Sequence, residues 1–191
     1  MDLVLRLLAG GGLALPCGIS AYLPLLVLGV AGVGKKITLS APVDFLASWP
    51  AVAVLALLVG FDLFADKMPD FQPTNRIISQ ITRPLAGGLG CAALISPDLL
   101  FPALSFVIGA LLAEAMHVVK SNLRPALANS GQLARLMEPL ISIGEDGLVV
   151  VLAILALAAP VVAGPVSLLI LVGCWFWQFS LRRKARQVVQ P

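Results

Sequence analysis

Long apolar stretches separated by short polar segments run along the whole chain. The six most prominent cover about residues 3–30, 49–65, 77–96, 99–119, 147–162 and 165–181. A helix that spans a bilayer needs roughly 20 apolar residues. The first stretch is too long for one straight helix, whereas the second and fifth are short. The pattern predicts an all-α integral membrane protein with about six transmembrane helices.

Two of the apolar stretches are interrupted in the same way. The segment "GISAYLPLLVLG", which begins at residue 18, contains Ser20 and Pro24. The segment "VKSNLRPALANS", which begins at residue 119, has the same Ser-x-x-x-Pro spacing in Ser121 and Pro125. Backbone groups that such breaks leave unpaired must be satisfied by neighbouring helices or by water in a cavity. We therefore expect broken or re-entrant segments within a helical bundle.

The two halves of the chain resemble each other. A shift of 101 residues superposes the two Ser-x-x-x-Pro segments, and a shift of 97 superposes "VAVLALL" on "VVVLAIL". Each unit holds three predicted spans, so the second unit must enter the membrane from the opposite side. Chance similarity is the alternative, because Leu, Ala and Val matches are common in an apolar chain. We expect a single transmembrane domain over residues 1–191, with inverted repeats over about 1–97 and 98–191.

Composition and charge agree with a membrane protein. The chain is 59% hydrophobic and 12% charged, with a mean hydropathy of +0.99, whereas a soluble domain has about 25% charged residues. In a six-span topology, eleven of the 13 Lys and Arg residues lie on the side that holds both termini. Only Lys35 and Lys36 lie on the other side. The positive-inside rule then predicts that the N- and C-termini are cytoplasmic.

Charged side chains gather near the predicted cytoplasmic ends of the spans. Asp62 and Asp66 are four residues apart, and Glu114 and His117 are three apart, so each pair shares a helix face. Charged groups inside apolar spans are costly and are often functional. The candidate substrate-binding residues are Ser20, Pro24, Asp62, Asp66, Lys67, Arg83, Glu114, His117, Ser121, Asn122, Arg124, Pro125, Glu145 and Asp146.

Two explanations of these charges stay open. The first is a hydrated substrate site, in which Asp62 and Glu114 bind a cation or relay a proton and Arg83 and Arg124 bind an anionic group. The second is ion pairing and helix capping at the membrane interface. Glu145 and Asp146 in particular stand at the predicted start of a helix, where carboxylates are favourable.

The sequence contains no recognisable motif for other classes of chemistry. One histidine, scattered carboxylates and three cysteines in apolar segments match no metal-site or disulfide spacing. The chain also has no nucleophile elbow, P-loop or dinucleotide fingerprint. The basic tail "RRKAR" is explained as a topology signal. We therefore expect no enzyme activity, no cofactor, no metal site and no nucleic-acid partner.

Four segments carry a family resemblance. "GISAYLPLLVLG", "FADKMP", "RPLAGGL" and "GEDGLVVVL" resemble, in order and spacing, the bacterial multi-pass membrane family catalogued as domain of unknown function 4126. The resemblance implies a small multi-pass protein of the bacterial inner membrane, without an established substrate or reaction. The family pattern leads us to expect Glu where this chain has Asp62, which keeps the carboxylate but shortens its reach.

Three functions fit these observations. The first is a transporter or permease that moves a small solute or ion through a site between the inverted repeats. The alternative is a non-transporting scaffold or assembly partner, in which Gly87, Gly88 and Gly90 dock a partner helix. A lipid-handling intramembrane protein that uses His117 as acid or base is a minor alternative. The expected partners are the lipid bilayer, an unknown small solute or ion, and a second copy in a homodimer.

Overall fold

The computed structural model describes residues 3–65, 72–95, 101–128 and 132–189, and within these ranges it is helical without a strand. The α-helical prediction is confirmed for this part of the chain. The elements are α1 (Leu3–Cys17), α2 (Tyr22–Val33), the 3-10 helix η1 (Asp44–Ala47), α3 (Trp49–Ala65), α4 (Gln72–Leu94), α5 (Pro102–Ala128), α6 (Gln132–Ala158) and α7 (Pro160–Val189).

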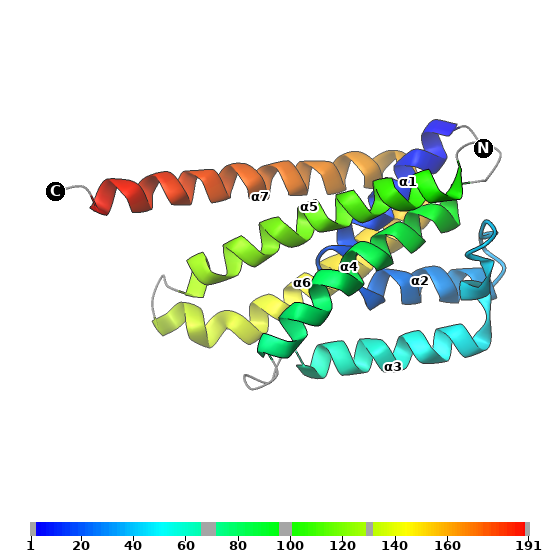
Figure 1. Ribbon diagram of the computed structural model, residues 1–191, viewed down its shortest axis with the longest axis horizontal. Coiled ribbons are helices and arrows are strands. Elements are labelled where there is room, and N and C mark those ends of the chain that lie inside the picture. Colours follow the sequence, from blue (N-terminus) through cyan, green and yellow to red (C-terminus); the bar gives the residue numbers. More distant parts are fainter. Residues whose placement is uncertain (1–2, 66–71, 96–100, 129–131, 190–191) are drawn as a thin grey trace.

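The first apolar stretch doubles back on itself. Helix α1 runs from one end of the bundle into its interior, and α2 returns to the same end (Figure 1). Arg6 near the start of α1 and Lys36 just after α2 line one cavity, so both ends of this hairpin lie on the same side. Residues 18–21, which join the two helices, form its tip. The stretch is thus a re-entrant hairpin, one of the two forms that the sequence predicts.

Pro24 does not break a helix. It is the third residue of α2 and its side chain is buried. The first four N–H groups of a helix have no intrahelical partner, so the missing N–H of a proline costs little in the first turn. The break in the sequence pattern is therefore the start of α2, and the tip before it makes the reversal.

The hairpin changes the predicted topology. We call the end of the bundle where α1 starts the N-terminal end, and the opposite end the C-terminal end. Helices α3, α5 and α7 run from the N-terminal to the C-terminal end, and α4 and α6 return (Figure 1). The chain therefore begins and finishes at opposite ends. This corrects the expectation that both termini share one side, because the hairpin does not cross the bundle.

The helix directions are those that inverted repeats require. Helices α2, α3 and α4 run opposite to α5, α6 and α7, in that order (Figure 1). The repeat itself stays a prediction, as do its boundaries. The second interrupted segment is not broken, however, since α5 is helical through Pro125 to its end at Ala128. Pro125 falls in the last turn of α5, where it removes the hydrogen bond that its own N–H would donate to the carbonyl of residue 121.

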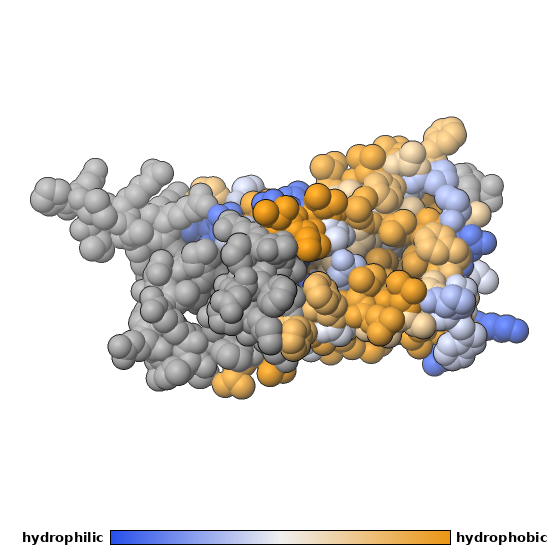
Figure 2. All heavy atoms as spheres, turned by 60° about the horizontal axis from the view of Figure 1, so that its bottom comes forward, coloured by the Kyte–Doolittle hydropathy of each residue, from blue (hydrophilic) through white to orange (hydrophobic). Residues whose placement is uncertain are grey.

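Several described helices suit a bilayer. Three segments are long and apolar enough to cross it: Pro102–Asn122, Leu140–Ala158 and Pro160–Ser180. Shorter apolar helices cover Leu3–Cys17, Tyr22–Val33 and Trp49–Phe64. Large hydrophobic side chains face outward, and Figure 2 shows them in orange over the described part of one face, with hydrophilic residues in blue at the N-terminal end. Such an apolar exterior indicates a membrane protein.

Helix boundaries agree with the sequence pattern in one case and depart from it in another. Helix α3 has the predicted bounds, 49–65. Helix α6 begins at Gln132 instead of near 147, so Glu145 and Asp146 lie in its middle and do not cap its N-terminus. The physical reason is that backbone hydrogen bonding continues through Glu145 and Asp146, whereas the predicted span begins only after these two charged residues.

Glycines bring the inner helices together. A Cβ atom on Gly87 of α4 would lie 2.7 Å from the carbonyl oxygen of Gly109 on α5. A Cβ on Gly88 would lie 2.6 Å from the Phe106 ring, and one on Gly90 would lie 3.2 Å from a leucine of α1. These glycines therefore pack within the chain, as small residues do at membrane helix crossings. This contradicts the scaffold hypothesis on one point, because this face is not open to a partner helix.

Candidate functional site

The tip of the hairpin presents backbone carbonyls inside the bundle. The last carbonyls of a helix have no intrahelical partner and carry the negative end of its dipole. Arg83 Nη1 of α4 donates to the carbonyl oxygen of Gly18 at 3.4 Å, and Lys120 Nζ of α5 donates to that of Ile19 at 2.8 Å. Two cations from neighbouring helices thus satisfy the backbone where α1 ends.

Gly18 lets the tip lie directly against α5. A Cβ atom at this position would lie 2.7 Å from the Met116 Cβ and 3.0 Å from the His117 backbone nitrogen, and closer still to the Ala113 carbonyl oxygen. Backbone and Cβ atoms cannot move aside as the end of a long side chain can. Only glycine therefore fits where the tip meets α5.

Arg83 and His117 form the most buried polar contact of the site. Arg83 Nη1 and His117 Nδ1 are 2.6 Å apart, and the two residues are 7% and 6% exposed. A guanidinium group can only donate, so Nδ1 must accept and the ring is neutral with its proton on Nε2. A proton added to Nδ1 would turn two donors toward each other and break this contact.

Lys120 of α5 contacts both the hairpin tip and α6. Its Nζ lies 2.8 Å from Glu145 Oε2 on α6 and 2.8 Å from the Ile19 carbonyl oxygen at the tip. Lys120 is 9% exposed and Glu145 is 24% exposed. Both residues lie within spans that suit a bilayer. An ion pair at this depth is costly to form and is often functional.

Glu114 adds a carboxylate on the same helix as His117. It lies one helical turn before His117 on the same face of α5. Its Oε2 atom is buried and accepts no hydrogen bond from the described residues. A buried carboxylate oxygen without a donor is unfavourable, so this position suits a proton or a bound cation.

The other predicted residues are placed as follows. Ser20 is buried at the tip, 4% exposed. Ser121 Oγ and Asn122 Nδ2 both donate to the Val118 carbonyl oxygen, at 3.0 and 2.8 Å, so they serve their own helix. Two carboxylates are half-buried, namely Asp62 near the end of α3 and Asp146 beside Glu145.

Four predicted residues are described in part or not at all. Arg124 and Pro125 belong to the backbone of α5, and their side chains lie outside the described residues. Asp66 and Lys67 lie wholly outside them. The structure thus brings together Arg83, His117 and Glu145 around the tip, while the roles of all the predicted residues stay predictions.

The candidate site residues predicted from the sequence do not include Lys120 or the tip carbonyls. One signal for Lys120 is its spacing, three residues after His117 on the same helix face. A second is that Lys120 follows Ile19, whose carbonyl it binds, by 101 residues, the shift that relates the two halves. Backbone acceptors leave no mark on a sequence pattern, so the carbonyls could not be found in this way.

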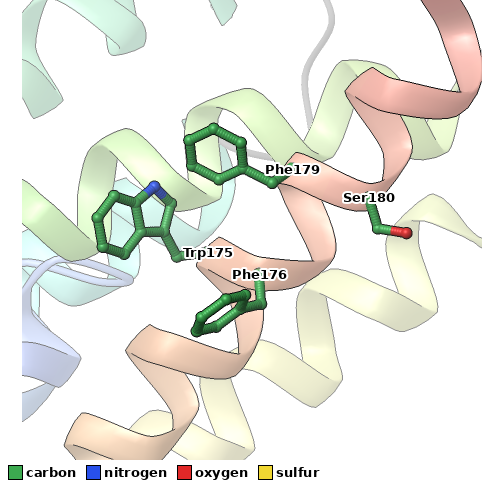
Figure 3. Close-up of a pocket in the computed structure, with 4 residues that line it drawn as sticks. All are labelled: Trp175, Phe176, Phe179 and Ser180. Carbon is green, nitrogen blue, oxygen red and sulfur yellow. The ribbon is translucent and has the colours of Figure 1, made fainter.

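A hollow on α7 differs in character from this cluster. Its volume is about 490 Å³, and its described lining is Trp175, Phe176, Phe179 and Ser180. Trp175 and Phe179 project from one side of α7 with ring centroids 5.8 Å apart, and Phe176 projects from another (Figure 3). Aromatic residues of this kind are typical of the membrane interface, and the described lining of the hollow includes no charged residue.

Comparison with known proteins identifies one family. A family model for the domain of unknown function DUF4126 matches residues 7–179. The chain belongs to the DUF4126 family. The segments of this DUF4126 protein that carry the resemblance include Gly18, Arg83 and Glu145, which meet around the tip. No curated protein and no solved structure matches the chain.

The chemistry available at the tip of this DUF4126 protein is ionic. No group of three or more His, Cys, Asp or Glu that could hold a metal ion occurs among the residues described. What is present is a neutral histidine that accepts from an arginine, a lysine–carboxylate pair, and a carboxylate oxygen that accepts no hydrogen bond from its described surroundings. This arrangement can exchange a proton or hold a small ion.

Proposed function

We propose that this DUF4126 protein is a transporter or permease of a small solute or ion, with its site at the hairpin tip. The observation that carries the proposal is the non-helical backbone at the tip, held inside the bundle by Arg83 and Lys120. Non-helical backbone at membrane depth is tolerated where it is buried in protein or lines a water-filled cavity. Transporters place their binding sites at breaks of this kind.

The directions of the helices support the same proposal. Helices α2–α4 and α5–α7 run in opposite senses (Figure 1), as two inverted units would. The tip also touches α5 at positions that the 101-residue shift relates, Ile19 and Lys120. Substrate sites in such transporters lie at the interface between the repeats, and with the predicted repeat boundaries the contact between the tip and α5 joins one repeat to the other.

The Arg83–His117 contact suggests how transport is linked to protons. The contact requires the neutral imidazole, and a proton on Nδ1 would release Arg83 from the ring. Arg83 also donates to the Gly18 carbonyl at the tip, and Glu114 and Lys120 lie three residues to either side of His117 on α5. Glu145 reaches the cluster from α6 through Lys120. In this proposal, protonation of His117 opens the closed cluster.

Flux measurements test the proposal. The purified protein is reconstituted in proteoliposomes, and uptake of cations, anions and small carboxylates is measured with and without a pH gradient. We expect flux for one class of solute, reduced at least about tenfold by Lys120→Met and by Glu145→Gln. Asp44→Asn, which removes a charge from an exposed position in η1, is the matched control. Absence of flux for every class, or flux that these variants leave unchanged, would reject the proposal.

The charge distribution suggests an orientation. Arg6, Lys35 and Lys36 share the N-terminal end of the bundle, and the other ten of the 13 Lys and Arg residues follow later in the chain. Four of these ten follow Ser180, where the α7 span finishes. By the positive-inside rule, we propose that the C-terminal end faces the cytoplasm of a bacterial inner membrane and the N-terminal end faces outward.

A further inference from the structure

A basic cavity lies at the N-terminal end of the bundle, away from the hairpin tip. Its volume is about 370 Å³, and it lies where α1 begins and where α2, α4 and α6 end. Arg6, Lys35, Lys36 and Thr38 line it with polar groups, and Leu94 and Pro160 belong to its apolar wall. A cavity with a cationic side and an apolar side has the character of an amphiphile site.

Arg6, which lines this cavity, has a donor group without an acceptor among the described residues. Its Nη1 donates to the Leu94 carbonyl oxygen at 3.5 Å, a long contact. Its Nε is buried and has no acceptor among the described residues. A buried N–H without an acceptor is unfavourable, and the planar guanidinium is suited to bind the oxygens of a phosphate group with two donors. Arg6 therefore lines the cavity with a guanidinium group whose hydrogen-bonding capacity the described residues do not fill.

The backbone holds two lysines at the rim. Helix α2 ends in a Schellman motif, in which Lys35 N–H donates to Gly32 O at 2.9 Å and Lys36 N–H donates to Ala31 O at 3.1 Å. The left-handed position of this motif, normally a glycine, is Lys35, with φ of 54°. Side chains rarely adopt this conformation. Its presence here is consistent with a use for the lysine itself.

The charges of the cavity are not balanced by its own lining. The described lining residues include three cations and no carboxylate. Both lysines are exposed, so their ammonium groups are available to a ligand. Three cationic residues that line one cavity attract an anion that carries more than one oxygen acceptor. The apolar wall favours a ligand whose remainder is hydrophobic.

We propose that this cavity binds a phosphate-bearing anion through Arg6, Lys35 and Lys36. Two sources share this chemistry, namely the headgroup of an anionic phospholipid and free inorganic phosphate. The site is separate from the tip cluster, so the proposal goes beyond the transport function and does not depend on it. Arg6 supplies the planar donor pair and the lysines supply point charges at the rim.

Lipid and phosphate binding by the full chain tests the proposal. The protein in nanodiscs of phosphatidylcholine is titrated with phosphatidylglycerol or with inorganic phosphate, and bound ligand is measured by native mass spectrometry. We expect Lys35→Gln/Lys36→Gln to weaken binding of one of these probes about tenfold or more. The control is Arg182→Gln/Arg183→Gln, which removes the same charge from the tail. Retained binding in that control is part of the expected result.

The outcomes separate the two sources. Phosphatidylglycerol binding that is lost in the double lysine variant, with no phosphate binding, supports a lipid headgroup site. Phosphate binding that is lost in the same variant supports a site for the free anion. Equal binding of both probes by wild type and the lysine variant overturns the proposal. Arg6→Gln is a second variant, and its thermal unfolding is compared with wild type because Arg6 also contacts Leu94.

Discussion

Lys120 connects three parts of the molecule through one ammonium group. It donates to the tip carbonyl of Ile19 and pairs with Glu145 of α6, at 2.8 Å in each case. An ammonium group has three donors and no acceptor, so both partners are served at once. Replacement of Lys120 therefore affects the hairpin, α5 and α6 together, which distinguishes it from the loss of a surface charge.

Lys120→Met is expected to lower stability by about 2 kcal/mol. The loss lies below the roughly 3–5 kcal/mol of a fully buried broken pair, because Glu145 keeps 24% of its side chain exposed. Unfolding in detergent micelles measures the effect. Lys120→Met/Glu145→Gln should regain part of the loss, and Asp44→Asn should change little. A single variant as stable as wild type would contradict the assigned pairing.

Gly18→Ala is expected to destabilise the protein by about 2 kcal/mol or more, because the added Cβ meets Met116 and the backbone of α5. The matched control is Gly147→Ala on α6, where no atom lies within 4 Å of the added Cβ. Alanine is the better helix former, so the control should be neutral or stabilising by up to about 1 kcal/mol. Equal thermal stability of the two variants would contradict this expectation.

At the scale of helices, the close crossing of α4 and α5 sets the shape of the bundle interior. Gly87 and Gly109 face each other there, and the Arg83–His117 contact follows further along the same interface. Helices that approach through glycines bring their backbones near each other. The crossing thus positions the two helices whose side chains reach the tip.

Gly109→Leu is expected to separate α4 from α5 and to prevent a monodisperse preparation. The leucine would enter the space that Gly87 and Cys91 occupy, and overpacking of this size costs at least about 1–3 kcal/mol. Size-exclusion chromatography in detergent measures the outcome. Gly173→Leu, at an open position of α7, should elute like wild type. Equal profiles for both variants would show that the crossing tolerates a larger spacing.

Sequence patterns could predict the helices better than their connections. Hydropathy marks α3 correctly at 49–65 because its whole length is apolar. It misses the first half of α6, because Glu145 and Asp146 interrupt an apolar run that begins at Leu140. The pattern at Pro24 shows an interruption, but a hairpin and a broken span have the same apolar residues in the same order. The direction of α2 depends on contacts with later helices, which no local pattern contains.

The candidate site could be predicted in part. The i, i+3 spacing places Glu114 and His117 on one face, and apolar context marks Arg83 as unusual. The meeting of Arg83 with His117 depends on how α4 packs against α5, so spacing alone could not pair them. The Glu145–Lys120 pair escapes prediction for a related reason, since the sequence pattern places Glu145 at the start of a helix and not in the middle of one.

At the scale of the whole molecule, the hairpin places the two ends of the chain on opposite sides. Helices α3 to α7 run between the two ends of the bundle, whereas the α1–α2 hairpin enters and leaves at the same end (Figure 1). Arg6 consequently joins Lys35 and Lys36 at the N-terminal end. The basic cavity exists only in this topology, because a six-span arrangement would move Arg6 to the other side of the membrane.

Cysteine labelling tests the topology. Leu3→Cys and Lys36→Cys, each in a background without the three native cysteines, should both react with a membrane-impermeant maleimide added to whole cells. Arg183→Cys should react only after permeabilisation. The reason is that the first two positions share the N-terminal end, which we propose faces outward. Opposite accessibility of Leu3→Cys and Lys36→Cys would instead support a broken span that crosses the membrane.

The hairpin tip is synthesised long before the residues that satisfy it. Lys120 follows Ile19 by 101 residues, and a ribosome that adds about 5–20 residues per second needs roughly 5–20 s to make that stretch. During this interval the tip carbonyls lack their cations, and unsatisfied backbone in lipid costs several kcal/mol per group. The hairpin therefore reaches its final position only after α5 has emerged. We therefore expect that insertion of this protein does not proceed strictly from the first helix to the last.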